Sequence, residues 1–401
     1  MDLPEADTSR EMSGMDHEIA AILREKYINW NDLHRLSRRP GGFQSNEIRN
    51  RVWPKLLNID RYSIPDYRQF INNHPDYSQV QCDIERSLWS YQHVLKWPDE
   101  LLHRRRESLS NIIMAILSRN KELHYFQGLH DIVSVFLLVF QEDALTFAVA
   151  EHVCLHVFNV CLLKDFEIMK ETMYVIMIII KVVDNQLYSR LTSVNMEPFF
   201  AISWIITWFS HSVKGIQYIS RIFDVMLCSP PYYSYYLAAA YVLLHRDSIM
   251  DLELDNATIH HNLSGLPSLE QFPFEDVLIY ADNLLQSLPI EAVLRRRDVS
   301  KELKELVTSG KLVLFNNIDY SGLVVPSDWT LLRNSHVVRG NNVDRIDWGW
   351  KTSKPSNVHM KNHKNKQQRK SYMKYMWILS VIGVVTVADI IMRNKLSSMY
   401  T

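Results

Sequence analysis

Long apolar segments of helical length run through the middle of the chain, and they restrict it to folds built from packed helices. Residues 109–117 repeat their apolar side chains at helical spacing along one face. Residues 129–140 and 173–183 are apolar enough to form central helices, and residues 199–209 follow Pro198, a residue type favoured in the first turn of a helix. Because no convincing alternating strand pattern or Asn-Gly hairpin signal accompanies them, we predict an all-α fold.

Two apolar stretches allow an alternative interpretation. Residues 175–180 would suit a strand if taken alone, but with their neighbours they are long enough for a helix. Residues 225–244 contain no Asp, Glu, Lys or Arg, which raises the alternative of a membrane span. Pro230 and Pro231 interrupt this stretch and its tyrosines would place hydroxyls in lipid, so we predict two core helices joined at the proline pair. We expect the helical domain to cover residues 40–300.

The charge balance argues against a whole-chain nucleic-acid binder. Lys+Arg 44 against Asp+Glu 45 gives a formal net charge of -1, whereas such a binder would be strongly basic. Hydrophobic residues make up 47% and charged residues 22%, which are proportions of a folded globular protein. The four cysteines lack CxxC and zinc-ligand spacing, so we expect buried thiols in a reducing compartment: Cys82, Cys154, Cys161 and Cys228.

Polar and charged segments are predicted on both sides of the helical core. Residues 1–18 carry six acids, one Arg and no apolar stretch, so no secretory signal is expected and residues 1–20 are predicted to be a disordered acidic segment. Residues 294–311 have the pattern of a charged amphipathic helix. Residues 314–357 lack a sustained period, and residues 314–374 are predicted to be a linker that leads into a basic juxtamembrane segment.

A second kind of apolar segment follows this linker. Residues 375–392 contain one charged side chain, Asp389, and an α-helix of that length spans about 27 Å, close to the thickness of a membrane interior. Eight Lys or Arg and no acids lie between Lys351 and Lys374, so the positive-inside rule places the body of the protein in the cytosol. A buried core helix is the alternative, but the flanking charges favour a single-pass tail anchor over residues 375–392.

Two short motifs carry side chains that could perform chemistry. Asp83 and Arg86 are three residues apart, so on a helix the carboxylate can orient the guanidinium. Gly128 relaxes the backbone just before the helix expected from residue 129, so Gln127 can project from a tight loop. Taken separately, a surface ion pair and an ordinary turn are the simpler explanations of these patterns.

Other familiar sites find no support in the sequence. It contains no GxxxxGK[ST] or GxGxxG phosphate loop, no HExxH and no GxSxG. The adjacent His260 and His261 cannot easily share one metal ion, and we expect them on a loop surface. The arginine runs at 104–106 and 295–297 are expected to be solvated faces, with contact to an acidic partner as the alternative.

Taken in order, three motifs resemble the TBC domain of Rab GTPase-activating proteins. The opening Arg-x-Val-Trp-Pro-like element of that family is matched by residues 49–57, which include Trp53 and Pro54. The IxxDxxR motif is matched by Val80–Asp83–Arg86, with Val in place of Ile, and the YxQG motif by residues 125–128.

Two later elements extend this resemblance to about residues 40–290. A Pro-aromatic-Trp element is matched by residues 198–204, and an RIWD-like element by residues 221–224. Phe223 stands where the family has Trp, one aromatic ring for another, so we expect the packing there to survive. The resemblance therefore implies an all-α TBC domain.

The resemblance also implies a mechanism. In the family, an arginine and a glutamine enter the Rab active site in trans, which assigns Arg86 as the arginine finger and Gln127 as the group that orients the attacking water. Asp83, Tyr125 and Gly128 would support these two side chains. GTP and magnesium are then bound by the Rab partner, so no cofactor or metal of the chain's own is expected.

Together with the apolar run at 375–392, the chain resembles the tail-anchored TBC proteins that reside in the endoplasmic reticulum. That resemblance implies a Rab of the Rab-one class in its GTP form as partner, a role in ER-to-Golgi vesicle traffic, and a cytosolic catalytic domain on the ER membrane. The alternative is a non-catalytic TBC scaffold that binds a Rab or an ER-shaping membrane protein. No nucleic-acid partner is expected.

Overall fold

Every regular element of the described part of the chain is a helix, and no strand occurs there, which confirms the all-α prediction. The computed structural model describes residues 18–24, 30–164, 166–265, 274–296 and 299–301. The predicted linker and tail anchor, residues 314–374 and 375–392, lie outside these ranges. Among the described helices, none combines the length and the apolar character needed to cross a bilayer.

The helices fall into an earlier and a later set along the chain. The earlier set consists of α2 Trp30–Arg38, α3 Asn46–Leu56, the 3-10 helix η1 Tyr67–Phe70, α4 Tyr77–Glu85, α5 Trp89–Leu95, α6 Asp99–Arg119, α7 Leu129–Phe140 and α8 Asp143–His156. The later set consists of α9 Glu167–Val183, α10 Asn185–Ser193, the 3-10 helix η2 Pro198–Ala201, α11 Ile202–Ile206, α12 Ile216–Met226, α13 Tyr233–Leu244, α14 Arg246–Asp251, α15 Asn256–Gly265, α16 Phe274–Ser287 and α17 Ile290–Leu294.

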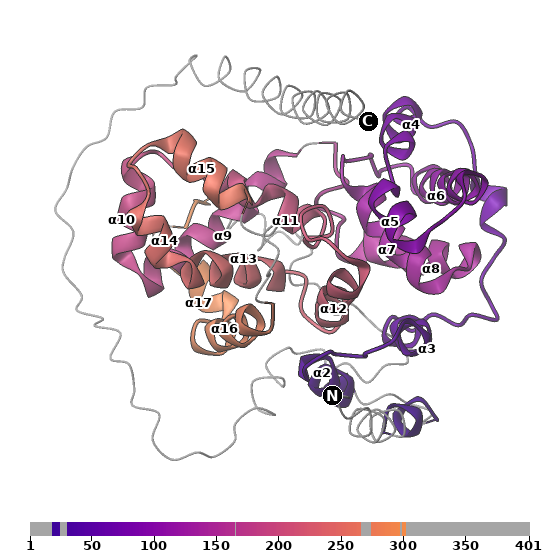
Figure 1. Ribbon diagram of the computed structural model, residues 1–401, viewed down its shortest axis with the longest axis horizontal. Coiled ribbons are helices and arrows are strands. Elements are labelled where there is room, and N and C mark those ends of the chain that lie inside the picture. Colours follow the sequence, from indigo (N-terminus) through magenta and orange to yellow (C-terminus); the bar gives the residue numbers. More distant parts are fainter. Residues whose placement is uncertain (1–17, 25–29, 165, 266–273, 297–298, 302–401) are drawn as a thin grey trace, which may run out of the picture. The chain divides into compact units, whose positions relative to one another are not determined.

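The two sets meet at α12. Helices α4, α6, α7 and α8 pack on one another, as do α9, α10, α13 and α16, and α12 contacts α2, α3 and α7 (Figure 1). Apolar side chains from both sets join one continuous buried core. Burial of this core, at about 25 cal/mol per Å² of apolar surface, is the main force that holds the helices together.

One central helix is buried more completely than an amphipathic pattern implies, and a second confirms a helix where a strand was the alternative. In α6, residues 109–117 were expected to bury one face, but Met114 and Ala115 are buried as well because η1, α4, α7 and α8 all pack against this helix. The expected helix over residues 173–183 is confirmed as part of α9, which excludes the strand alternative for 175–180.

The proline pair separates two helices, as predicted. Helix α12 ends at Met226 and α13 begins at Tyr233, with Pro230 and Pro231 in the turn between them. The residues of α13 from 233 to 243 are buried in protein. Burial in the protein core therefore explains why this helix carries no charged side chain.

The expected single helix over residues 199–209 was wrong. The chain instead forms η2 and the short α11, and Trp208 and Phe209 then adopt positive φ angles of 46° and 64°. The Oγ1 of Thr207 donates to the carbonyl of Ser203 at 2.6 Å, a local bond that competes with regular helix, and burial of both aromatic rings outweighs the backbone cost.

The adjacent histidines lie on a helix and not on a loop. His260 and His261 belong to α15, so that expectation was wrong. The side chain of Asp255 accepts a hydrogen bond from the backbone N–H of Thr258 at 2.8 Å, which is the capping arrangement that starts a helix. A cap directly before a weakly periodic segment is easily missed.

The folded unit begins before residue 40, and residues 18–20 are helical where disorder was predicted. Ile19 is 2% exposed and packs in the same core as Leu33 and Leu36 of α2. The carboxylate of Glu18 pairs with Arg35 at 2.5 Å and with Arg39 at 2.8 Å. The acidic composition of the segment concealed these two contacts.

Three of the four cysteines are buried, and burial raises the pKa of the Cys161 and Cys228 thiols to about 12. Cys82 is exposed, contrary to the expectation, because α4 turns Val80, Asp83 and Ile84 toward the core instead. No disulfide joins these four thiols.

Candidate functional site

Helix α4 holds the predicted acid–arginine pair at its C-terminal end. Asp83 lies in the last turn, 2% exposed, and Arg86 is the residue that caps the helix. The Nη2 of Arg86 donates a hydrogen bond to the Oδ1 of Asp83, as the spacing predicted. The side chain of Arg86 is 52% exposed, so the buried carboxylate holds one side of a guanidinium whose other nitrogens remain available.

The loop before α7 places Gln127 at the surface. Tyr125 and Phe126 are buried, Gln127 is exposed, and Gly128 caps α7 with a φ of 121°. A Cβ at Gly128 would lie 2.8 Å from the Cγ2 of Thr207, so both the positive φ and the close approach require glycine. The prediction that Gly128 allows Gln127 to project from a tight loop is confirmed.

A buried hydrogen bond joins the two motifs. The hydroxyl of Tyr125 donates to the Oδ2 of Asp83 at 2.7 Å, and the backbone N–H of Tyr125 donates to the Oδ2 of Asp76 at 2.8 Å. Burial and the Asp83 carboxylate raise the pKa of Tyr125, so the phenol stays protonated and can donate. Because Asp83 also holds Arg86, one carboxylate positions both the arginine and the glutamine loop.

Three further polar residues continue this network, and the sequence motifs did not point to them. The Nδ1 of His130 lies 2.9 Å from the hydroxyl of Tyr125, and its Nε2 lies 3.4 Å from the Oδ1 of Asp131. The Nδ1 of His211 lies 3.0 Å from the Oδ2 of Asp131. No local pattern could have revealed this contact, because Asp131 and His211 are 80 residues apart in the chain.

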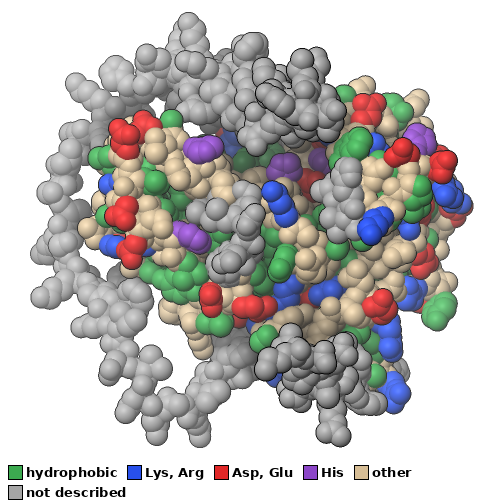
Figure 2. All heavy atoms as spheres, viewed as in Figure 1, with side chains coloured by type: hydrophobic (Ala, Val, Ile, Leu, Met, Phe, Trp, Pro, Cys, Tyr) green, Lys and Arg blue, Asp and Glu red, His purple; other side chains and the backbone are tan. Residues whose placement is uncertain are grey.

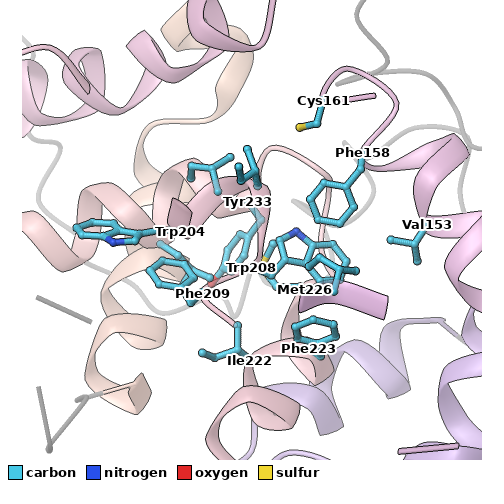
Figure 3. Packing of buried hydrophobic residues seen from close by; sticks show 14 of the residues in the cluster. Val153, Phe158, Cys161, Trp204, Trp208, Phe209, Ile222, Phe223, Met226 and Tyr233 are labelled. Carbon is cyan, nitrogen blue, oxygen red and sulfur yellow. The ribbon is translucent and has the colours of Figure 1, made fainter. Parts of the chain in front are cut away.

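A row of packed aromatic rings supports the glutamine loop through Phe126. Phe126 packs against Phe158 with ring centroids 6.2 Å apart, and Phe158 packs against Trp208 at 5.0 Å. Figure 3 shows Trp208 between Phe158 and Phe223, whose centroid is 5.1 Å from it. Trp208 holds this ring contact with a positive φ of 46°.

A second buried carboxylate ties the opening element to the RIWD-like element. The Oδ2 of Asp224 accepts from the Nη2 of Arg49 at 2.9 Å and from the backbone N–H of Phe43 at 3.1 Å, and its Oδ1 accepts from the Nε1 of Trp53 at 2.9 Å. Burial raises the pKa of Asp224, and Arg49 opposes that shift. Phe223 packs on Trp53 at 6.1 Å, so the expected aromatic packing is confirmed.

One arginine run takes part in the site's framework. Arg104 is exposed, as expected, but Arg106 donates from Nε and Nη2 to the carbonyl of Ser87 at 3.0 and 2.8 Å and lies over the ring of Trp89. It therefore braces the backbone directly after Arg86.

Acidic and basic side chains are interspersed on the face shown in Figure 2. In the described residues, no group of His, Cys, Asp or Glu is arranged to hold a metal ion.

The helices and motifs match a known family of domains. The model of the Rab-GTPase-TBC domain matches residues 46–250, a stretch that includes Asp224 and both members of the α4 pair. The chain belongs to this TBC family. This family is that of the Rab GTPase-activating TBC domains, which agrees with the resemblance of the ordered motifs.

Curated relatives and solved structures agree with this assignment. TBC1 domain family member 20 of Mus musculus is 32% identical over 294 residues, 73% of this chain and 72% of the relative. GTPase-activating protein gyp10 of Schizosaccharomyces pombe is 29% identical over 265 residues, 65% of this chain and 69% of the relative. The solved Ypt/Rab-GAP domain of Gyp1p shares the TBC fold, with a TM-score of 0.56 and 18% identity over 69% of this chain and 97% of that one.

Proposed function

We propose that this TBC protein accelerates GTP hydrolysis by a Rab protein, and that Arg86 and Gln127 enter the Rab active site in trans. The observation that carries the proposal is a contrast in burial. Arg86 and Gln127 are exposed, while Asp83 and Tyr125 beneath them are buried and hydrogen-bonded to each other. Side chains that must reach a partner need exposed tips, and side chains that must reach it in a fixed direction need buried supports.

The chemistry of GTP hydrolysis requires the two kinds of group that these residues provide. Negative charge develops on the phosphate oxygens, and the attacking water must be held in line with the bond that breaks. The guanidinium of Arg86 offsets the charge, and the carboxamide of Gln127 orients the water. GTP and magnesium belong to the Rab, so the chain contributes only side chains.

Substrate class and membrane are finer parts of the same proposal. We infer a Rab of the Rab-one class that acts between the ER and the Golgi, since the ordered motifs together with the predicted tail anchor at 375–392 resemble the ER-resident TBC proteins, and TBC1 domain family member 20 is similar over most of this chain. If the activator is anchored in the same membrane as its Rab, the effective concentration of the Rab near the activator is raised.

Single-turnover GTP hydrolysis by a panel of Rab proteins tests the activity. With the full chain in detergent, we expect acceleration of at least one Rab of the Rab-one class, and a loss of at least about 10²-fold for Gln127→Ala because the water is no longer oriented. Gln69→Ala, at an exposed glutamine of η1, is the matched control and should keep the wild-type rate. Equal rates for the two variants would remove Gln127 from the mechanism.

A non-catalytic scaffold is the competing function. A chain that only binds a Rab has no need of an exposed arginine and an exposed glutamine on jointly buried supports, which favours catalysis. Tight binding of a GTP-loaded Rab in a pull-down, with no change in its hydrolysis rate across the panel, would establish the scaffold instead.

The membrane anchor has its own test. If residues 375–392 form the tail anchor of an ER protein, truncation after Tyr375 should move the protein from the carbonate-resistant membrane fraction to the supernatant, because the apolar segment that lipid would bury is gone. Removal of residues 393–401 alone is the matched control and should leave the protein in the membrane. A membrane-bound Tyr375 truncation would contradict the anchor.

A further inference from the structure

A chain of polar side chains leads from the arginine to the surface of the turn after α11. It runs from Arg86 to Asp83, through Tyr125 and His130 to Asp131, and ends at His211. The TBC motifs include only the first three of these groups. His130 and Asp131 come from the first turn of α7, so the chain connects α4, α7 and the turn that follows α11.

The hydrogen bonds of this chain assign its protons. Tyr125 has one proton and gives it to Asp83, so the Nδ1 of His130 must be the donor to the phenol oxygen at 2.9 Å. The Nε2 of His130 then faces the Oδ1 of Asp131 at 3.4 Å. His130 therefore links the phenol of Tyr125 to the carboxylate of Asp131.

The exposure of the side chains differs sharply along this series of polar contacts. The side chains of Asp83 and His130 are 3% and 8% exposed, that of Asp131 is 23% exposed, and that of His211 is 62% exposed. His211 is therefore the member that solvent protons reach most readily. Its Nδ1 donates to the Oδ2 of Asp131, which leaves the Oδ1 of Asp131 directed at His130.

We propose that His211 is a positioning residue of the GTPase-activating site, which in its protonated form holds Asp131 against His130 and thereby fixes the Asp83 carboxylate that orients Arg86. This inference rests on the proposed function of Arg86. It adds a residue outside the TBC motifs and a dependence of the activity on pH.

The charged groups that surround His211 act in opposite directions. The hydrogen bond that His211 donates to Asp131 raises the pKa of His211, Asp83 adds to the rise, and partial burial and Arg86 oppose it. Burial would raise the pKa of Asp131, but His130, His211 and Arg86 hold it below the ordinary range.

One further titratable group faces Asp131. Tyr91 of α5 lies near this carboxylate, and burial first and Asp131 second raise the pKa of that phenol, so it stays neutral at physiological pH. The net result of the surroundings is a raised pKa for His211, so its charge is lost as the pH rises through and above the ordinary histidine range.

The pH profile of the activity tests the proposal. For the full chain with an accelerated Rab, we expect the maximal single-turnover rate, divided by the Rab's intrinsic rate at each pH, to fall about fivefold between pH 6 and pH 8.5, because a charge-assisted hydrogen bond becomes a neutral one. His211→Gln keeps a neutral donor, so its profile should be flat at the lower rate. The Rab concentration for half-maximal rate should not change.

His261→Gln is the matched control, since His261 is also an exposed histidine and lies on α15. It should retain the wild-type profile. A His211→Gln profile that follows the wild type, or an effect confined to the half-maximal Rab concentration, would overturn the positioning role.

A second measurement needs no Rab and separates this inference from the proposed function. NMR titration of the full chain labelled at histidine Cε1 should give His211 a pKa above the ordinary value, and Asp131→Asn should lower it. An unchanged His211 pKa in Asp131→Asn would show that Asp131 and His211 are not coupled and would overturn the inference. If the pKa falls but the panel shows no accelerated Rab, the coupling stands while the GTPase-activating role of both Arg86 and His211 is refuted.

Discussion

Arg86→Ala is expected to slow Rab GTP hydrolysis by about 10³–10⁵-fold at saturating protein, which corresponds to about 4–7 kcal/mol of lost transition-state stabilisation. The expected size follows from the geometry of the side chain. Asp83 engages the Nη2 of Arg86 and its second oxygen is engaged by Tyr125, so the remaining guanidinium nitrogens are presented in one direction. Removal of the side chain therefore removes a pre-oriented charge.

Arg86→Lys should be nearly as slow as Arg86→Ala. A lysine ammonium can pair with Asp83 or reach toward a phosphate, but it lacks the planar fork that lets the arginine serve both partners at once. The measurement is single-turnover hydrolysis with the Rab that the wild type accelerates most.

Two controls separate catalysis from folding and from net charge. Arg295→Ala removes an exposed arginine after α17 and should retain the wild-type rate. The unfolding free energy of each variant shows whether the domain remains folded. Arg86→Ala within tenfold of the wild type would exclude the arginine-finger mechanism for this chain.

Asp224→Ala is expected to lower the unfolding free energy by about 3–5 kcal/mol, because it leaves a buried guanidinium without its counter-charge. The side chains of Asp224 and Arg49 are 0% and 5% exposed, so water cannot replace the lost partner. The N–H groups of Phe43 and Trp53 lose their acceptor in the same step.

Urea-induced unfolding of the full chain, followed by tryptophan fluorescence, measures this effect, since Trp53 and Trp208 lie in the core beside the site of change. Asp247→Ala is the matched control. The side chain of Asp247 is 90% exposed and pairs with Arg246 at the surface, so its loss should change the unfolding free energy by less than about 0.5 kcal/mol. Equal effects of the two substitutions would contradict a structural role for the buried pair.

The sequence sufficed where the deciding interactions are local. The length and apolar character of α7 and α9 are properties of neighbouring residues, so the sequence alone locates both helices. Pro230 and Pro231 block a helix by their own covalent geometry, which is why the break between α12 and α13 was also predictable. The i,i+3 contact of Asp83 and Arg86 follows from helix geometry in the same way.

Tertiary packing decided what local preference leaves open. Residues 199–209 have a helical pattern, yet the burial of Trp208 and Phe209 selects positive φ angles that end the helix early. Residues 18–20 end an acidic segment and were predicted to be disordered with it, but Ile19 packs in the core. In both cases the gain comes from surfaces contributed by distant parts of the chain.

The same contrast between local and tertiary determinants applies to the candidate site. By itself, the sequence located most of the long helices and the two motifs that contain Arg86 and Gln127, because apolar segments and short motifs are encoded within a few residues of each position. Only the tertiary structure decided that Tyr125 bonds to Asp83 and that His211 reaches Asp131. The physical reason is that such contacts join residues tens of positions apart, and their geometry exists only after the core has brought the helices together.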